Sequence, residues 1–96
     1  MSYSLEFKVS ALKAWDKLDA SVKTQFKARL KERLINPHVM SARLSGMPDC
    51  YKIKLRSVGY RLVYQVNDKM ITVTVIAIGK RDKNKVYDLA KRSLNE

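Results

Sequence analysis

The segment that decides the fold reads Cys50-Tyr-Lys-Ile-Lys-Leu-Arg56, in which apolar and cationic side chains alternate. Side chains at alternate positions of a β-strand lie on the same face. The segment therefore predicts a strand with an apolar face and, opposite it, a face that carries Lys52, Lys54 and Arg56.

Two further strand signals follow this segment along the chain, over Tyr60–Val66 and Met70–Ile78. Ser57-Val58-Gly59 and Asn67-Asp68-Lys69 supply turn residues between the three predicted strands. The run from Ile71 to Ile78 is β-branched almost throughout, which is typical of a central strand that is covered on both faces. A final helix is predicted from about Asp82, as its cap, to Leu94.

The N-terminal half predicts one strand and two helices. Residues 2–8 alternate as a strand does, with Tyr3, Leu5 and Phe7 on one side. Ser10 is the expected cap of a helix that carries Leu12, Trp15 and Leu18, and Ser21 that of a second helix ending at Asn36-Pro37. One face of the second helix is apolar and holds Val22, Phe26, Leu30 and Leu34. The other face is cationic and holds Lys23, Lys27, Arg29, Lys31 and Arg33.

The predicted fold class is α+β, with the element order strand, helix, helix, strand, strand, strand, helix. We expect the two N-terminal helices to pair and to cover one face of a small antiparallel sheet. Residues 38–49 contain Gly46 and Pro48 and show no clear period, which indicates a loop. A length of 96 residues predicts a single domain over residues 1–96.

Charge limits the function classes. Twenty Lys and Arg against nine Asp and Glu give a net charge of +11, which predicts a polyanionic partner. No apolar run is long enough to predict a membrane span, and no signal peptide is recognised. Cys50 is the only cysteine, so an internal disulfide is excluded, in keeping with the cytoplasm. One cysteine and one histidine, His38, are too few for an ordinary zinc site.

The cations of the second half predict a phosphate site. Arg61 falls on the same face as Lys52 and Lys54 if the hairpin keeps register, and Arg81 follows the adjoining strand. Convergent Arg and Lys side chains bind phosphate through bidentate and point-charge contacts. Arg43 in the loop is a further candidate. The alternative is a solvated face or charges that protect a sheet edge, and for Arg56 alone this alternative is favoured.

Tyr87 is a candidate general base, because it lies one helical turn after Lys83 and near Arg81. Packing is the commoner role of a helical tyrosine. Tyr60 and Tyr64 are expected to face away from Arg61, which weakens any case for base stacking. His38 is expected in a surface loop. The carboxylates are dispersed, which argues against a metal-dependent nuclease; they include Asp49, Asp68, Asp82 and Asp88.

Three motifs resemble the RelE toxins of bacterial toxin–antitoxin pairs: residues 46–57 (GMPDCYKIKLRS), residues 59–66 (GYRLVYQV), and Gly79-Lys-Arg81 with Val86-Tyr87. The similarity covers essentially the whole chain. It implies a microbial-ribonuclease-like fold, and an endoribonuclease that cleaves mRNA in the ribosomal A site through the ribose 2′-hydroxyl, without metal or cofactor.

The resemblance also implies roles for single residues. Tyr87 is the general base, Arg81 stabilises the transition state and is proposed to protonate the leaving oxygen, and three further cations hold the phosphate: Lys52, Lys54 and Arg61. Apart from the resemblance, we predict peripheral contacts to RNA or ribosome at Arg43, Arg56, Lys80 and Lys83. Ser45 replaces a basic residue that is common in the family.

The partners implied are the ribosome with mRNA in its A site, and a RelB-like antitoxin that contacts or displaces the last helix through Val86, Leu89, Ala90 and Leu94. Operator DNA is reached only through the antitoxin, and no membrane is involved. Two alternatives stay open: a basic module that blocks the ribosome or another RNA without cutting, and a module whose positive face binds only an acidic protein.

Overall fold

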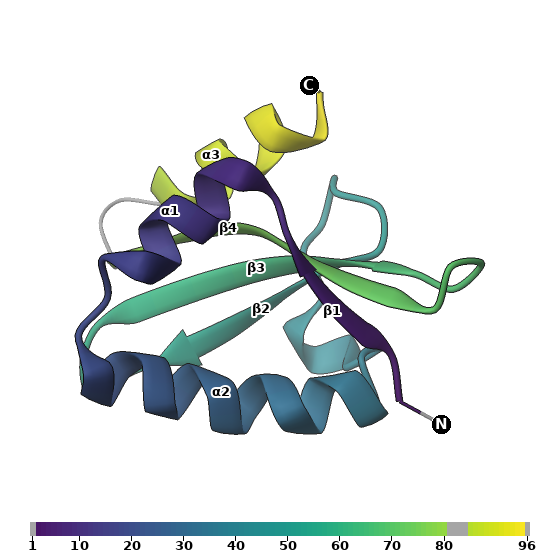
Figure 1. Ribbon diagram of the computed structural model, residues 1–96. Coiled ribbons are helices and arrows are strands. Elements are labelled where there is room, and N and C mark those ends of the chain that lie inside the picture. The colour runs from purple at the N-terminus through teal and green to yellow at the C-terminus, as the bar shows by residue number, and fades with distance from the viewer. Residues whose placement is uncertain (1, 81–84, 96) are drawn as a thin grey trace.

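A four-stranded sheet organises the chain, in the order β1-β4-β3-β2 (Figure 1). The computed structural model describes residues 2–80 and 85–95. The strands are β1 (Ser4–Phe7), β2 (Cys50–Leu55), β3 (Tyr60–Asn67) and β4 (Thr72–Lys80). The helices are α1 (Val9–Asp16), α2 (Ala20–Ile35) and α3 (Lys85–Leu94), with a short 3-10 helix, η1 (Met40–Ala42). No helix in these ranges is long and apolar enough to cross a membrane.

The element order and the α+β class are confirmed, and the expectation of a purely antiparallel sheet is wrong for one strand. β2, β3 and β4 pair antiparallel, whereas β1 pairs parallel with β4. No tight turn joins β1 to its neighbour, because two helices and two strands lie between them, so local sequence does not constrain its direction. β4 lies between β1 and β3, as its β-branched sequence predicted.

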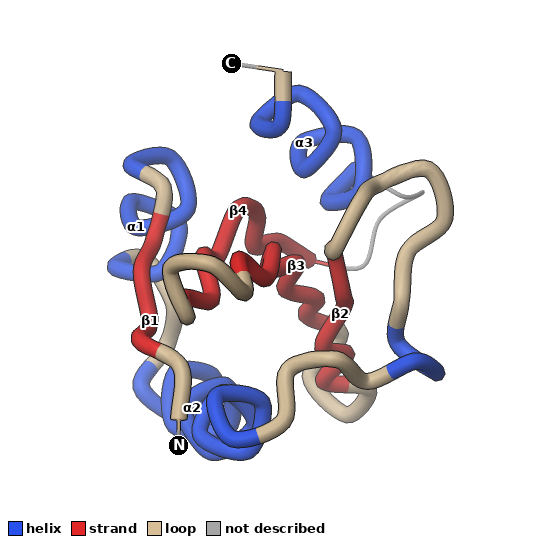
Figure 2. The backbone as a smooth tube through the Cα atoms, turned by 90° about the vertical axis from the view of Figure 1, so that its right-hand side faces the viewer, coloured by secondary structure: helices blue, strands red, loops and turns tan. Residues whose placement is uncertain are grey.

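The two faces of the sheet bury separate sets of side chains. The first cluster joins α2 to the sheet and includes Val22, Phe26, Leu30, Ile53 and Tyr64. The second cluster joins α3 to the opposite face and includes Cys50, Val63, Ile76, Val86 and Ala90. Figure 2 shows α2 and α3 on opposite sides of the strands.

A β-bulge lets β4 serve both clusters. Val63 pairs with Ala77 and Tyr64 with Val75, so Ile76 is the extra residue. Ile76 and Ala77 consequently both belong to the second cluster, although they are consecutive, while Val75 belongs to the first.

The N-terminal helices differ from expectation in their placement. α2 packs against β2, whereas α1 packs against β4, beside the edge where β1 ends (Figure 1). Trp15 and Leu18 pack on the first cluster as predicted, but Leu12 is 44% exposed and Ala11 is buried in its stead. A helix at the edge of a sheet buries only a narrow stripe, which accounts for the exposure of Leu12.

Both helices also begin before the predicted caps. The carbonyl of Lys8 accepts the amide of Leu12, and that of Asp19 accepts the amide of Lys23, so the first turns precede Ser10 and Ser21. α2 ends at Ile35, before Pro37, as predicted. The expected cap of α3, Asp82, lies outside the described residues.

A set of surface hydrogen bonds, here called the polar clasp, joins the N-terminus, the end of α2 and the β3–β4 turn. Tyr3 Oη donates to Asp68 Oδ1 at 2.6 Å, and His38 Nε2 donates to the same oxygen at 2.9 Å. In neutral His38, Nδ1 then accepts from Tyr51 Oη at 2.7 Å. His38 is thus half-buried and tied to β2, rather than a plain surface side chain.

The turn inside the clasp is conformationally strained. Ile71 has a φ of 51°, in the left-handed region that β-branched residues rarely adopt. Its carbonyl accepts the amide of Ser4 at 2.9 Å, which starts the pairing of β1. β4 therefore begins at Thr72, two residues later than predicted, because Met70 and Ile71 belong to the turn.

Replacing Gly79 by Ala is expected to destabilise the packing of α3. A Cβ on Gly79 meets Val86 Cγ2 at 3.0 Å, and overpacking of this kind costs about 1–3 kcal/mol. Urea unfolding of Gly79→Ala, Val86→Ala and the double variant measures the coupling. The loss of unfolding free energy in the double variant should be smaller than the sum of the losses in the two single variants. Additive losses would show that residues 79 and 86 are not in tight contact.

The clasp predicts an acid-sensitive contribution to stability. The hydrogen bond from Tyr3, then that from His38, lowers the pKa of Asp68 below its ordinary 3.8. Because the pKa of Asp68 is lower in the folded than in the unfolded chain, the ionised carboxylate stabilises the fold at pH values above its ordinary pKa. This stabilisation is lost as the pH falls through the folded-state pKa. Urea midpoints measured from pH 5.5 downward should fall less steeply for Asp68→Asn than for the parent chain. Glu6→Gln is the control, and equal slopes for all three proteins would contradict the role of Asp68.

Candidate active site

Three strands place candidate side chains in one row. Lys54 of β2 pairs with Arg61 of β3, and Arg61 pairs with Gly79 of β4. Directly paired residues share a face of the sheet, and this is the face covered by α3, because Val63, two residues after Arg61, belongs to the second cluster. Lys52 lies two residues from Lys54 on the same face, and both are half-buried. The predicted register of Lys52, Lys54 and Arg61 is confirmed.

Gly79 allows the helix to complete this row. With no side chain at Gly79, Val86 packs directly on the strand, in the second cluster. The next residue, Tyr87, then lies against Arg61, whose Cζ is 5.4 Å from the centroid of the phenol ring. This is the range of a cation–π contact, which orients the ring relative to the guanidinium. The structure thus brings Tyr87 to the cations of β2 and β3.

The remaining predicted positions divide into three groups. Arg43 is exposed beside β2, with a β-bridge from its backbone to Tyr51, and Arg56 and Lys80 are exposed at strand ends. Tyr60 and Tyr64 pack with the first cluster and face away from Arg61, as expected. Arg81 and Lys83 lie outside the described residues.

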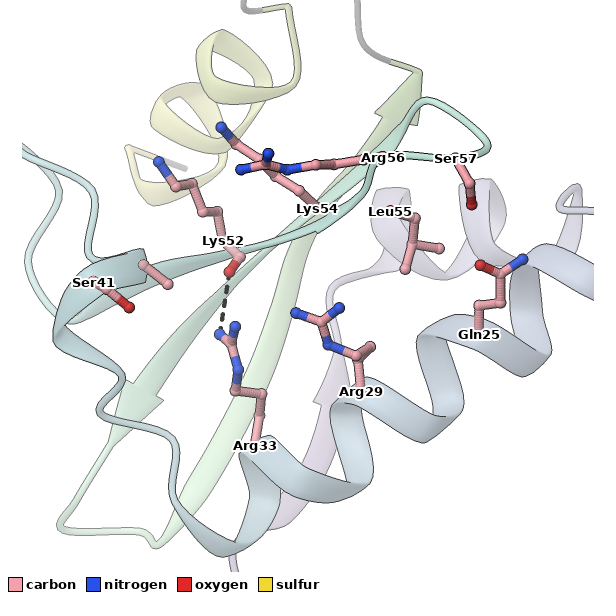
Figure 3. Close-up of a pocket in the computed structure, with 10 residues that line it drawn as sticks. Gln25, Arg29, Arg33, Ser41, Lys52, Lys54, Leu55, Arg56 and Ser57 are labelled. Atoms are coloured by element: carbon pink, nitrogen blue, oxygen red, sulfur yellow. Dashed lines mark hydrogen bonds between the residues drawn. The ribbon is translucent and has the colours of Figure 1, made fainter.

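A groove of about 420 Å³ lies between α2 and β2, the strand at one end of the sheet order (Figure 3). Figure 3 shows Arg29 and Arg33 extending from α2 toward β2, with Arg33 at the backbone carbonyl of Lys52, whereas the side chains of Lys52, Lys54 and Arg56 lie on the far side of β2 from α2. Other side chains in the wall are Gln25, Ser41, Ala42, Leu55 and Ser57. The α2 side of this groove was missed by sequence reasoning, although Gln25, Arg29 and Arg33 follow the four-residue spacing of one helical stripe.

Arg33 is buried, at 9% exposure, and does not belong to the solvated face predicted for it. Its Nη1 donates to the carbonyl of Lys52 at 3.1 Å and to Tyr64 Oη at 2.9 Å. Tyr64 Oη donates in turn to the carbonyl of Pro37 at 2.7 Å. Burial raises the pKa of Tyr64, and the Arg33 contact opposes this shift. These bonds satisfy a buried charge and attach α2 to the backbone of a candidate site residue.

The apolar stripe predicted for α3 is present with one exception. Val86 and Ala90 are buried and Leu94 packs on the second cluster, but Leu89 is 49% exposed. Leu89 instead borders a hollow of about 360 Å³ between α1 and α3. Only a narrow face of α3 packs on the sheet, so Leu89, which lies beside that face, stays partly exposed to solvent.

Other reactive groups are few in residues 2–80 and 85–95. No three His, Cys, Asp or Glu side chains of this part of the chain gather as a metal site would require. Burial raises the pKa of the Cys50 thiol to about 11, which disfavours its thiolate. The chemistry that the described cluster offers is that of a phenol among cations.

Comparison with known proteins gives a consistent family. The ParE toxin of the type II toxin–antitoxin system, parDE, matches residues 5–85. The chain is 51% identical over 94 residues to the mRNA interferase toxin RelE of Escherichia coli strain K12, covering 98% of this chain and 99% of that one. The mRNA interferase RelE of Shigella flexneri matches equally.

Solved structures agree. The isolated E. coli RelE toxin superposes with a TM-score of 0.83 at 49% identity, covering 97% of this chain and 99% of that chain. The intact E. coli RelBE toxin–antitoxin complex contains a chain that superposes with a TM-score of 0.83 at 52% identity, covering 85% and 100%. On sequence and fold together, this chain belongs to the RelE toxins, within the ParE toxin family of type II toxin–antitoxin systems.

Proposed function

We propose that this chain is the toxin of a toxin–antitoxin pair, an endoribonuclease that cuts mRNA in the ribosomal A site and so stops translation. Its relatives at 51% identity are mRNA interferases. The observation that carries the proposal is the meeting of Tyr87 with Arg61 beside Lys54. A ribosomal substrate places the action of the toxin in the cytoplasm.

The proposed reaction is an intramolecular displacement. Tyr87, as its phenolate, takes the proton of a ribose 2′-hydroxyl and becomes the neutral phenol, and the 2′-oxygen attacks the adjacent phosphorus. A 2′-O–P bond forms as the P–O5′ bond breaks, which leaves a 2′,3′-cyclic phosphate and a 5′-oxygen that takes up a proton. Lys52, Lys54 and Arg61 hold the phosphate and the charge that develops on its oxygens.

The resemblance assigns transition-state stabilisation and protonation of the 5′-oxygen to Arg81, which lies outside the described residues. An arginine rarely releases its proton near neutral pH, so charge stabilisation should be the greater part of any such role. With a tyrosine phenolate as base and no better acid than arginine, most of the acceleration must come from alignment of the 2′-oxygen with the phosphodiester. The ribosome supplies that alignment by holding the codon.

The neutralising partner is a RelB-like antitoxin, since an E. coli RelE chain of the same fold is found in a complex with RelB. We infer that the antitoxin acts on α3, whose buried residues Val86 and Ala90 position Tyr87 and whose Leu89 is half-exposed. Moving α3 removes Tyr87 from Arg61. Binding of operator DNA belongs to the antitoxin.

The first test maps 5′ ends of mRNA in a translating extract and on the same RNA without ribosomes. Cuts are expected within A-site codons, and only when ribosomes are present. Tyr87→Phe should slow cleavage by about 10²–10⁴-fold, the usual contribution of a general base, and leave ribosome binding unchanged.

Tyr3→Phe is the matched control, because Tyr3 lies at the clasp, near the opposite end of β3 from Arg61. Full inhibition of translation by Tyr87→Phe without cleavage would instead favour a module that occludes the ribosome. Rapid cutting of naked RNA at the same enzyme concentration would refute the dependence on ribosomes.

Removal of residues 89–96 is expected to affect cleavage more than folding. The deletion takes Ala90 and Leu94 from the second cluster, which frees Tyr87, but it leaves the first cluster complete. Cleavage should fall at least as far as in Tyr87→Phe, while circular dichroism still reports a cooperative melt. Deletion of residues 95–96 is the control, and normal cleavage by the longer deletion would contradict a role for α3.

A further inference from the structure

The edge of β2 that is turned away from β3 has two backbone carbonyls with partners outside the sheet. The carbonyl of Cys50 accepts the amide of Leu44 at 3.0 Å, and that of Lys52 accepts Arg33 Nη1 at 3.1 Å. Backbone groups of alternate residues point to the same side of an antiparallel strand, so these two carbonyls lie on one edge. At Lys52, a guanidinium therefore takes the place that the amide of a neighbouring strand has inside a sheet.

The core holds this guanidinium in place. Arg33 Nη1 also donates to Tyr64 Oη at 2.9 Å, and Tyr64 Oη donates to the carbonyl of Pro37 at 2.7 Å. The guanidinium carbon of Arg33 lies 5.7 Å from the centre of the Tyr64 ring, and that fully buried ring stacks on Tyr51 at 5.6 Å. A donor fixed on the core in this way can fix the carbonyl that it contacts.

The packing of the fold does not itself call for a charge at Arg33. The partners just named are a carbonyl, a hydroxyl and an aromatic ring, all of them neutral. Burying a charge is unfavourable, and an apolar side chain of similar volume is often as good for stability or better. What an apolar side chain cannot supply is a directed hydrogen bond to the backbone of β2.

We propose that Arg33 is a positioning residue for the candidate active site: it fixes the backbone of Lys52 and so directs the Lys52 amine to the scissile phosphate. The side chains of Arg33 and Lys52 lie on opposite sides of β2, so Arg33 acts through the strand and does not touch the RNA (Figure 3). The inference rests on the proposed function for the role of Lys52. Small displacements of a group that binds the transition state lower the rate strongly.

The test compares Arg33→Met, Lys52→Met and the double variant in cleavage of an A-site codon, with the protein in excess over ribosomes. Arg33→Met should lower the rate at saturation by about tenfold and leave the half-saturating concentration unchanged. The double variant should be no slower than Lys52→Met, because Arg33 acts only through Lys52. Lys31→Met, which removes the same charge from an exposed position of α2, is the control and should cleave as the parent does.

Arg33→Lys gives a check by partial rescue. An ammonium group can still donate to the Lys52 carbonyl, so this variant should cleave faster than Arg33→Met. Three results would overturn the proposal. They are losses that multiply in the double variant, an equal loss in Lys31→Met, and a raised half-saturating concentration with an unchanged rate at saturation.

Amide hydrogen exchange followed by NMR tests the same contact without cleavage. Arg33→Met should speed exchange of the Tyr51 and Ile53 amides by about tenfold and leave that of Val75 in β4 unchanged, since only the edge strand loses a bond. Tyr64→Phe keeps the ring and removes a hydroxyl that holds Arg33, so it should act in the same direction, and it replaces Arg33→Met if that variant does not fold. Parent-like exchange in β2 would contradict the proposal, whereas failure of the proposed function would be seen separately, as absence of cuts by the parent chain.

Discussion

The approach of α3 to β4 at Gly79 is the contact on which the site depends. Cross-strand pairing already brings Lys54, Arg61 and Gly79 into one row, and a Cβ at the third position would lie 3.0 Å from Val86 Cγ2, so that Val86 would have to shift. Val86 packs at Gly79, and the next residue, Tyr87, contacts Arg61. In the proposed function, the helix contributes the group that reacts, and the sheet contributes the cations that bind the phosphate.

Two of the cations that are proposed to bind phosphate, Lys52 and Lys54, lie on β2, at one end of the sheet order. Among the strands of residues 2–80, β2 has β3 as its one neighbour, so its other side must be supported from elsewhere. Arg33 provides this support at Lys52, and the β-bridge between Arg43 and Tyr51 provides it nearby. Edge strands are the more deformable parts of sheets. Arg33 both supports this edge of the sheet and lines the groove between α2 and β2. The position of Lys52 is therefore linked to that groove.

Much of this arrangement follows from local sequence. Alternation in residues 50–56 and the short turn at Ser57–Gly59 sufficed for the register of Lys52, Lys54 and Arg61, because a hairpin allows few registers. Local sequence did not predict three other features: the direction of β1, the exposure of Leu12 and Leu89, and the burial of Arg33. Each depends on which element happens to lie opposite, which is a property of the packed chain. The role proposed for Tyr87 came from family resemblance and residue chemistry, and its contact with Arg61 required the structure.

The strained turn before β4 bears on the order in which the chain folds. Ile71 adopts a backbone conformation that its own side chain disfavours, so the local sequence does not favour this turn. Both local and distant groups hold it: Met70 N donates to Asn67 Oδ1 within the turn, Ser4 N donates to the Ile71 carbonyl, and Tyr3 Oη donates to Asp68. Since part of this support comes from the N-terminal strand, we expect the turn to become fully fixed only after that strand has docked. The last region of the sheet to reach its native form is then the end that lies farthest from the candidate active site.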